Sequence, residues 1–260
     1  TFINNFAFPD LVTDFLGGGG EVVFDNSITT GVNQYEGTRM KAGIMHMSGL
    51  NNPEDSFGKI YVDARHYQKV HKQIVWANRL SYGHYFGNSP KPFLIGGADN
   101  WINAREEDGD PVIVNSAADL FYLQYVTNLR GFLYNARSGS KFLLHNSELR
   151  IPIIQYLTRQ PIGSGFFRNL QLTAFSDIGT AYTGSNPFSR NNSYNRQVIG
   201  EENSPFRAVV FNYRNPFLFG YGFGARTTLL GMYGKLDVAW GEEDNRKTGP
   251  RFYITLGYDF

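Results

Sequence analysis

Few side chains in this sequence stand at spacings that support catalysis or metal binding. The glycine run Gly17–Gly20 is not followed by the Lys-Ser/Thr of a phosphate-binding loop and precedes no predicted helix, so we interpret it as a flexible loop. His66 and His71 have no third ligand nearby at a zinc-site spacing. Cysteine and a Gly-x-Ser-x-Gly elbow are both absent. We therefore predict no enzyme activity, no metal site and no cofactor.

Two acidic stretches, Arg105–Asp110 and Gly241–Arg246, are the remaining candidates for a cation site. Neither has the ligand spacing of a calcium-binding loop, so we predict that both are solvated loops. The formal net charge of the chain is +1, which gives no electrostatic case for nucleic acid.

Alternating apolar and polar residues dominate the chain and predict an all-β, antiparallel fold. A strand projects alternate side chains to opposite faces. Apolar residues that fall only on even positions, or only on odd positions, of a segment therefore indicate a strand. We predict strands at 59–70, 74–86, 142–153, 170–182, 217–229 and 233–240, a terminal strand at 252–260, and weaker ones at 21–28 and 38–48. No segment has a convincing amphipathic-helix pattern, and no repeat or linker divides the 260 residues.

The end of the chain has the most regular alternation. One face of this segment is wholly apolar and aromatic, and consists of Phe252, Ile254, Leu256, Tyr258 and Phe260. The other face is polar, with Tyr253 as its only large ring. About ten residues suit a tilted strand that crosses a membrane, but a half-buried edge strand of a soluble sandwich has the same pattern.

Composition and connection lengths favour a membrane barrel over a soluble sandwich. Mean hydropathy is −0.33 and no apolar run reaches the length of a transmembrane helix, but barrel strands average to neutral because polar residues alternate with apolar ones. The predicted links at 70–73 and 230–233 are tight, whereas those at 87–141 and 184–216 are very long. Short turns on one side and long loops on the other are typical of outer-membrane barrels.

Several short motifs occur in one order along these predicted strands and loops. They are NLRGF (128–132), NSELRIPI (146–153), FSDIGTAY (175–182), GYGFGARTTLL (220–230), KLDVAW (235–240) and a terminal Phe. In this order the chain resembles the outer-membrane assembly-factor superfamily, the BamA-like bacterial surface antigens that include the transporters of two-partner secretion. The stretch GGADNWINARE (96–106) is similar to the branch with a periplasmic β-propeller ahead of the barrel.

The resemblance implies a sixteen-stranded antiparallel transmembrane β-barrel, of which residues 1–260 form the C-terminal nine or so strands of one domain. Further strands are then expected before Thr1. The loop at 87–141 is expected to enter the lumen. The terminal strand, on this resemblance, carries the signal for insertion and pairs with the first strand at a seam.

A lock for that loop is expected to consist of Arg130, Gly131, Phe132, Glu148 and Asp177. Both carboxylates fall on the polar parity of adjacent predicted strands, so one guanidinium with five donors can bridge them. The alternative is an Arg130 in a solvated loop and carboxylates that merely line a wet lumen. Arg150 and Arg226 also fall on the polar face. They could form a second layer of this lock, but we prefer to interpret them as generic lumen charges.

The function implied by the resemblance is insertion or translocation of other proteins through the lateral seam, in the outer membrane of a Gram-negative bacterium. Expected partners are outer-membrane lipid, client outer-membrane or secreted proteins, and periplasmic or lipoprotein subunits of a larger complex. Two rival functions stay open: a non-inserting barrel that anchors a periplasmic domain within a larger complex, and a passive channel.

Overall fold

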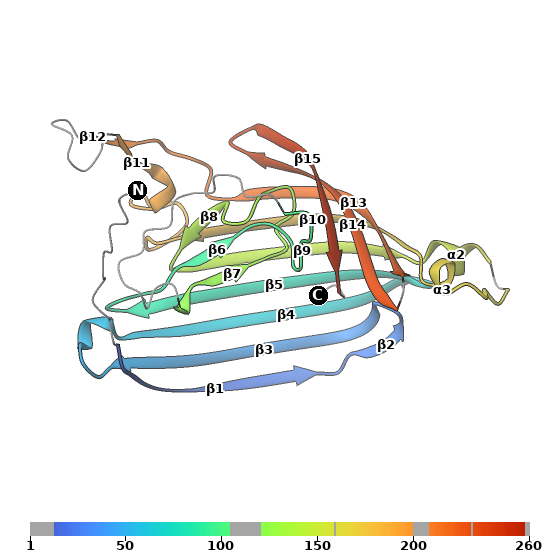
Figure 1. Ribbon diagram of the computed structural model, residues 1–260, viewed down its shortest axis with the longest axis horizontal. Coiled ribbons are helices and arrows are strands. Elements are labelled where there is room, and N and C mark those ends of the chain that lie inside the picture. The colour runs from blue at the N-terminus through green and yellow to red at the C-terminus, as the bar shows by residue number, and fades with distance from the viewer. Residues whose placement is uncertain (1–12, 105–120, 159, 200–207, 230, 258–260) are drawn as a thin grey trace, which may run out of the picture.

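The computed structural model describes residues 13–104, 121–158, 160–199, 208–229 and 231–257. The fold is all-β, as predicted, and one curved antiparallel sheet dominates it (Figure 1). Its strand order is β1-β3-β4-β5-β9-β10-β13-β14-β15, with β2 paired to β3 beside this path. The strands are β1 (Phe15–Asp25), β2 (Ile28–Gly31), β3 (Gln34–Gly49), β4 (Phe57–His71), β5 (Ile74–Gly87), β9 (Lys141–Ile151), β10 (Gln171–Tyr182), β13 (Leu218–Leu229), β14 (Met232–Glu243) and β15 (Arg246–Leu256).

The sheet is open within the described residues. β1 and β15 are its two end strands and are not paired with each other. The nine strands on the main path are 11 to 16 residues long, well above the five or six residues typical of globular proteins. One sheet of long strands thus dominates the fold, whereas a soluble β-sandwich consists of two sheets packed face to face.

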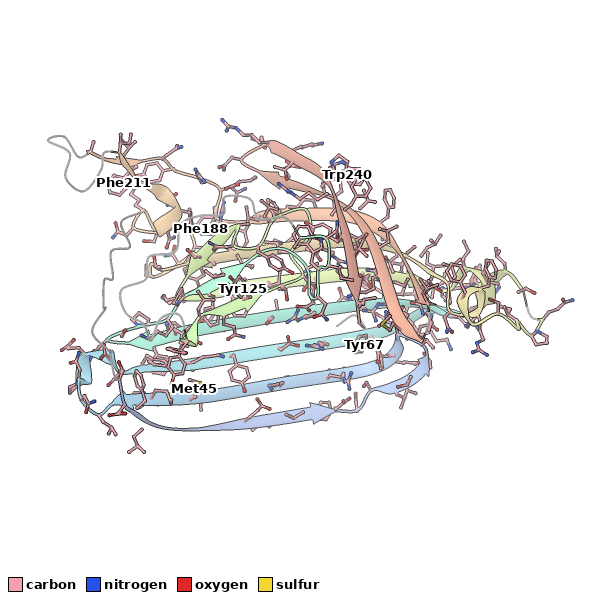
Figure 2. The ribbon with its side chains drawn as sticks, in the orientation of Figure 1. Met45, Tyr67, Tyr125, Phe188, Phe211 and Trp240 are labelled. Atoms are coloured by element: carbon pink, nitrogen blue, oxygen red, sulfur yellow. The ribbon has the colours of Figure 1, made fainter. Side chains whose placement is uncertain are left out.

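The two faces of the sheet differ sharply in chemistry. We call the face that packs against the connection between β5 and β9 the inner face, and the opposite one the outer face. On β9, inner residues from Phe142 to Arg150 are buried, and the residues between them are half exposed. Large apolar side chains occur on the outer face in every part of the sheet, and exposed examples are Val22 (71%), Ile44 (53%), Leu80 (50%), Leu172 (41%), Phe223 (56%) and Phe252 (56%). Trp240 of β14 also lies on this face (Figure 2).

The long connection between β5 and β9 lies along the inner face. Its described parts form a small sheet of β6 (Phe93–Ile95), β7 (Gln124–Val126) and β8 (Arg137–Gly139), which Figure 1 places within the curve of the main sheet. β6 and the loop after β7 contribute Phe93, Ile95, Leu129 and Phe132 to an apolar core with inner residues of the main strands. The acidic stretch Arg105–Asp110 lies outside the described residues.

The alternation of short and long connections is less regular than the sequence predicts. The tight links after β4 and β13 lie at one end of the sheet, but the same end carries residues 152–170, with α2 (Ile153–Leu157) and α3 (Gly165–Arg168). The opposite end carries the long connections after β5 and β10, and also the short link 50–56 with η1 (Pro53–Asp55). The connection after β10 includes η2 (Ser193–Asn195), β11 (Arg196–Ile199) and β12 (Ala208–Phe211). No described helix is long and apolar enough to cross a membrane.

Two predicted loops are instead part of the sheet. Gly17–Gly20 lies within β1 and pairs with β3, so the prediction of a flexible loop was wrong. Glycine suits this position because a Cβ at Gly19 would approach the carbonyl oxygen of Ile44 to 2.5 Å. Gly241–Arg246 is also mostly strand. Only Asp244 and Asn245 form the turn between β14 and β15, both with positive φ (50° and 61°), as tight hairpin turns require.

The terminal strand begins earlier than predicted. β15 starts at Arg246 because its first residues pair with β14 across a register shift at Ala239/Gly241. The Gly249-Pro250 pair interrupts the alternation there, which hid this part of the strand from the sequence pattern. Phe252, Ile254 and Leu256 lie on the outer face, as their parity indicates, whereas Tyr258 and Phe260 lie outside the described residues.

A buried ion-pair cluster as the candidate functional site

Arg130 lies on the inner face with its side chain only 4% exposed. It belongs to the loop after β7, where Asn128 (φ 72°) and Gly131 (φ 96°) turn the backbone through left-handed conformations. A Cβ at Gly131 would come within 2.5 Å of the carbonyl oxygen of Trp240, so only glycine allows this approach to β14. The loop is thereby pressed against the sheet and directs Arg130 towards β9 and β10.

Two carboxylates predicted from the sequence hold the Arg130 guanidinium. Its Nε lies 2.8 Å from Asp177 Oδ2 and its Nη2 lies 3.0 Å from Asp177 Oδ1, which makes a bidentate pair. Its Nη1 donates to Glu148 Oε2 at 2.9 Å. The Arg130 backbone N–H also donates to Asp177, at 3.1 Å. The guanidinium lies 3.4 Å from the centre of the Phe175 ring, which covers one of its planar faces.

The cluster is larger than the predicted lock. Asp237 of β14 lies 3.5 Å from Arg130 Nη1 and pairs with Arg226 Nη1 at 2.5 Å. Glu148 accepts from Arg150 Nε at 2.9 Å and from Arg226 Nη2 at 3.3 Å. Three guanidinium groups therefore face three carboxylates in a buried site, where each of the six side chains is at most 4% exposed.

Arg150 and Arg226 are thus integral members of this cluster, and our interpretation of them as generic charges was wrong. Both have fully buried side chains. Their role follows from charge balance: Arg130 alone would leave two of three carboxylates uncompensated, and an unpaired buried charge costs several kcal/mol, about 3 to 5. The alternation along the sequence places both residues on the inner face, but it does not indicate which strands lie close together in space.

The charge of Arg130 is permanent. Burial by itself opposes a positive charge, but Asp177, Asp237 and Glu148 raise the pKa of Arg130 well above its ordinary value. The cluster cannot be opened by deprotonation of this side chain at any pH that the protein survives. It therefore acts as a fixed attachment of the loop to the wall formed by β9, β10 and β14.

Tyr253 fastens the same loop to the terminal strand. Its hydroxyl accepts from Gly131 N at 2.8 Å and donates to the Phe132 carbonyl at 2.7 Å. Thr248 of β15 adds a hydrogen bond of 3.2 Å to the Gly131 carbonyl. The sequence carried a signal for this contact, because Tyr253 is the only large ring on the polar face of the terminal segment.

Two glycines on β13 make room for close neighbours, Gly220 for the loop backbone and Gly222 for the β14 backbone and the Phe175 ring. A Cβ at Gly220 would overlap the carbonyl oxygen of Arg130, and one at Gly222 would come within 2.8 Å of the Phe175 ring. The sequence shows that both glycines fall on the same face of the strand, but it does not show which neighbours require them. The structure thus brings Arg130, Gly131, Phe132, Glu148 and Asp177 together on one face, with Phe132 buried in the apolar core.

The chemistry of this site is structural pairing of charges. In the part of the chain that the structure describes, no group of three or more His, Asp or Glu residues is arranged to hold a metal ion. No protein-family model matches the chain, and no curated protein matches it. The family resemblance of the motifs consequently stays a prediction.

A double-mutant cycle tests the central ion pair. We expect Arg130→Gln and Asp177→Asn each to lower the free energy of unfolding by about 3–5 kcal/mol, because each leaves the buried cluster with one uncompensated charge. The double variant should lose clearly less than the sum. Arg39→Gln is the control, since its pair with Asp25 is exposed (41% and 38%) and should contribute little. Additive losses measured by denaturant titration would contradict the pairing.

Tyr253→Phe tests the link between the loop and β15. Removal of the hydroxyl leaves the Gly131 N–H and the Phe132 carbonyl buried without this partner, so we expect a loss of about 1–3 kcal/mol in unfolding free energy. Tyr221→Phe is the matched control, because Tyr221 lies on the outer face of β13. Equal effects of the two substitutions in denaturant titration would argue against the link.

Proposed function

We propose that this chain is the C-terminal part of a sixteen-stranded outer-membrane β-barrel that inserts or translocates other proteins through a lateral seam. The barrel would belong to the BamA-like superfamily and lie in the outer membrane of a Gram-negative bacterium. Its partners would be outer-membrane lipid on the outer face, client proteins at the seam, and periplasmic or lipoprotein subunits of a larger complex.

The observation that carries this proposal is the attachment of one loop to the inner face of the sheet, from its middle strands to its terminal strand. Arg130 joins the loop to β9, β10 and β14, while Gly131 and Phe132 join it to Tyr253 of β15. A buried ion-pair cluster contributes little net stability compared with apolar packing. We infer that its role here is to hold the loop and the strands β9, β10 and β14 in one arrangement. A barrel that opens at one seam needs its seam strand held to a rigid wall on one side, so that only the other edge of that strand can separate.

The two-faced sheet supports a membrane location. Exposed apolar side chains extend over the outer face from β1 to β15, and the charged groups gather on the inner face. In water, an apolar surface of this extent would be an aggregation hazard. In lipid, the same surface is solvated, and the polar inner face lines the barrel interior.

The mechanism follows from backbone chemistry at the edge of the sheet. Unpaired N–H and C=O groups in hydrocarbon cost several kcal/mol each, so an exposed edge binds an extended strand strongly. β15 would supply such an edge when the seam opens. An incoming client strand would pair with it and recruit its own neighbours, and no covalent step is needed.

One observation favours the alternative of a barrel that only anchors a periplasmic domain. The segment Asn100–Asn103 lies against the free edge of β15 and hydrogen bonds to it. A permanently covered edge would not template client strands. The passive channel has no such support, because the connection between β5 and β9 occupies the inner face.

Leu80→Arg tests the membrane location. Leu80 lies midway along β5 on the outer face and is 50% exposed, so in lipid an arginine there should cost about 2–4 kcal/mol of folding free energy. In water the substitution would be nearly neutral. The matched control is Phe188→Arg, at an exposed aromatic on the connection between β10 and β13 (Figure 2). Equal stability of the two variants refolded into lipid vesicles would count against embedding.

Client assembly tests the insertion activity directly. We expect vesicles that contain the full-length protein to accelerate folding of an unfolded outer-membrane barrel at least tenfold over empty vesicles, a change of about 1.4 kcal/mol in barrier height. Arg130→Gln should reduce this acceleration even in the fraction that migrates as a folded barrel on gels, whereas Arg39→Gln should not. A wild-type protein that folds but gives no acceleration would leave the anchoring function in its place.

A further inference from the structure

The edge of β15 that faces away from β14 is covered by a short segment of the same chain. Ile102 N donates to the Ile254 carbonyl at 2.8 Å, and Trp101 lies opposite Thr255 in an isolated antiparallel bridge. A strand at the end of a sheet normally offers such groups to any other chain. Here Asn100–Asn103, which we name the edge cap, binds them.

Two asparagine side chains complete the edge cap. Asn103 Oδ1 accepts from Ile254 N at 2.8 Å and its Nδ2 donates to the Phe252 carbonyl at 3.0 Å. Asn100 Nδ2 donates to the Leu256 carbonyl at 3.0 Å. An asparagine amide carries the same donor and acceptor as a peptide group. The edge cap therefore imitates a partner strand with only one bridged residue pair.

The edge cap is weakly held compared with a full strand. Its hydrogen bonds to β15 involve exposed atoms, and Ile102 is 60% exposed. By contrast, β14 pairs with β15 from Gly234 to Glu243, with a single register shift at Ala239/Gly241. An extended peptide offers a backbone N–H or C=O for every group that the edge cap satisfies, so it can replace the edge cap without leaving a buried group unpaired.

The edge cap is also connected to the loop that Arg130 holds. The Trp101 ring lies 4.4 Å from the Tyr253 ring, whose hydroxyl binds Gly131 and Phe132. Asp99, directly before the edge cap, accepts from Asn128 Nδ2 at 2.8 Å, two residues before Arg130. These two contacts connect the edge of β15 with the loop that carries Arg130, and so with the buried ion-pair cluster.

We propose that Asn100–Asn103 is a displaceable edge cap that holds the pairing edge of β15 when the first strand of the barrel has left the seam, until an extended client strand replaces the edge cap. This inference rests on the proposed function, because only an opening seam brings client strands to this edge. The edge cap keeps the edge from pairing with unrelated chains, and a client with a long amphipathic strand outcompetes it.

The test uses the full-length protein in lipid nanodiscs and a reversible cross-link. These 260 residues contain no cysteine, so Trp101→Cys with Thr255→Cys introduces the only cysteine pair within them. Facing residues of an antiparallel bridge have Cα atoms about 4.5–5.5 Å apart, which suits a disulfide. The probe is a fluorescent synthetic peptide with the sequence of β4, Phe57–His71. A copy with alternate N-methylated amides, which cannot pair as a strand, measures nonspecific binding.

We expect the oxidised cross-link to weaken peptide capture at least tenfold, and reduction to restore it. Asn100→Ala with Asn103→Ala removes three hydrogen bonds of the edge cap and should strengthen capture by about tenfold. Asn88→Ala is the matched control, because Asn88 lies in the same connection but binds the Pro53 carbonyl. Equal capture in the oxidised, reduced and alanine forms would overturn the proposal.

Hydrogen exchange provides a second measurement that needs no peptide. The Ile254 amide donates to Asn103, so its exchange should accelerate by about tenfold in Asn103→Ala and stay unchanged in Asn88→Ala. An Ile254 amide that exchanges freely in the wild-type protein would refute the edge cap.

Client assembly by the same variants separates the two proposals. If capture and exchange respond as expected but no variant inserts a client barrel, the edge cap stands and the proposed function fails. If oxidised and reduced forms insert clients equally and capture is also unchanged, the proposed function stands and the edge cap is wrong.

Discussion

A buried guanidinium must have both its charge and its donors matched, and the inner face of this protein is organised by that requirement at Arg130. Asp177 and Glu148 come from neighbouring strands, and Asp237 comes from a strand further along the sheet. Three acids around one cation would leave an excess of negative charge, which Arg150 and Arg226 offset. The cluster therefore constrains strand register, since a slip of one residue would turn each of these side chains to the outer face.

The distribution of polar and apolar groups reverses that of a soluble sheet protein. Charged side chains are buried on the inner face, and large apolar side chains are exposed on the outer one. Charge burial on this scale is tolerable because each group has partners, whereas the apolar outer face has none within the described residues. The outer face consequently depends on its surroundings in a way that the inner face does not.

The connection between β5 and β9 joins parts of the sheet that strand pairing leaves far apart. Through Arg130 it contacts β9 and β10, and through Gly131 it contacts the terminal strand. Trp101 and Tyr253 extend this contact to the free edge of β15. The same loop thus contacts the wall formed by β9, β10 and β14 and the edge of β15. We expect a substitution that loosens one of these contacts to affect the other.

The sequence alone predicted the nine long strands, though not all of their bounds, and the side chains that each face would carry. Alternation is a local pattern with a period of two residues, so Glu148, Asp177 and Tyr253 could be placed on the inner face without coordinates. The ordered motifs further directed attention to Arg130. The same reasoning misjudged Gly17–Gly20, because glycine in an end strand satisfies a close approach that no local pattern reports.

Only the tertiary structure decided which of those inner-face groups meet. Asp237, Arg150 and Arg226 joined the cluster through the curvature of the sheet and the register of pairs separated by tens of residues. The path of the loop depends on two glycines, Gly131 within the loop and Gly220 on β13, which faces it. The edge cap on β15 brings together residues about 150 positions apart in the chain. Such contacts depend on packing between distant segments, and the sequence of either segment alone carries no information about the other.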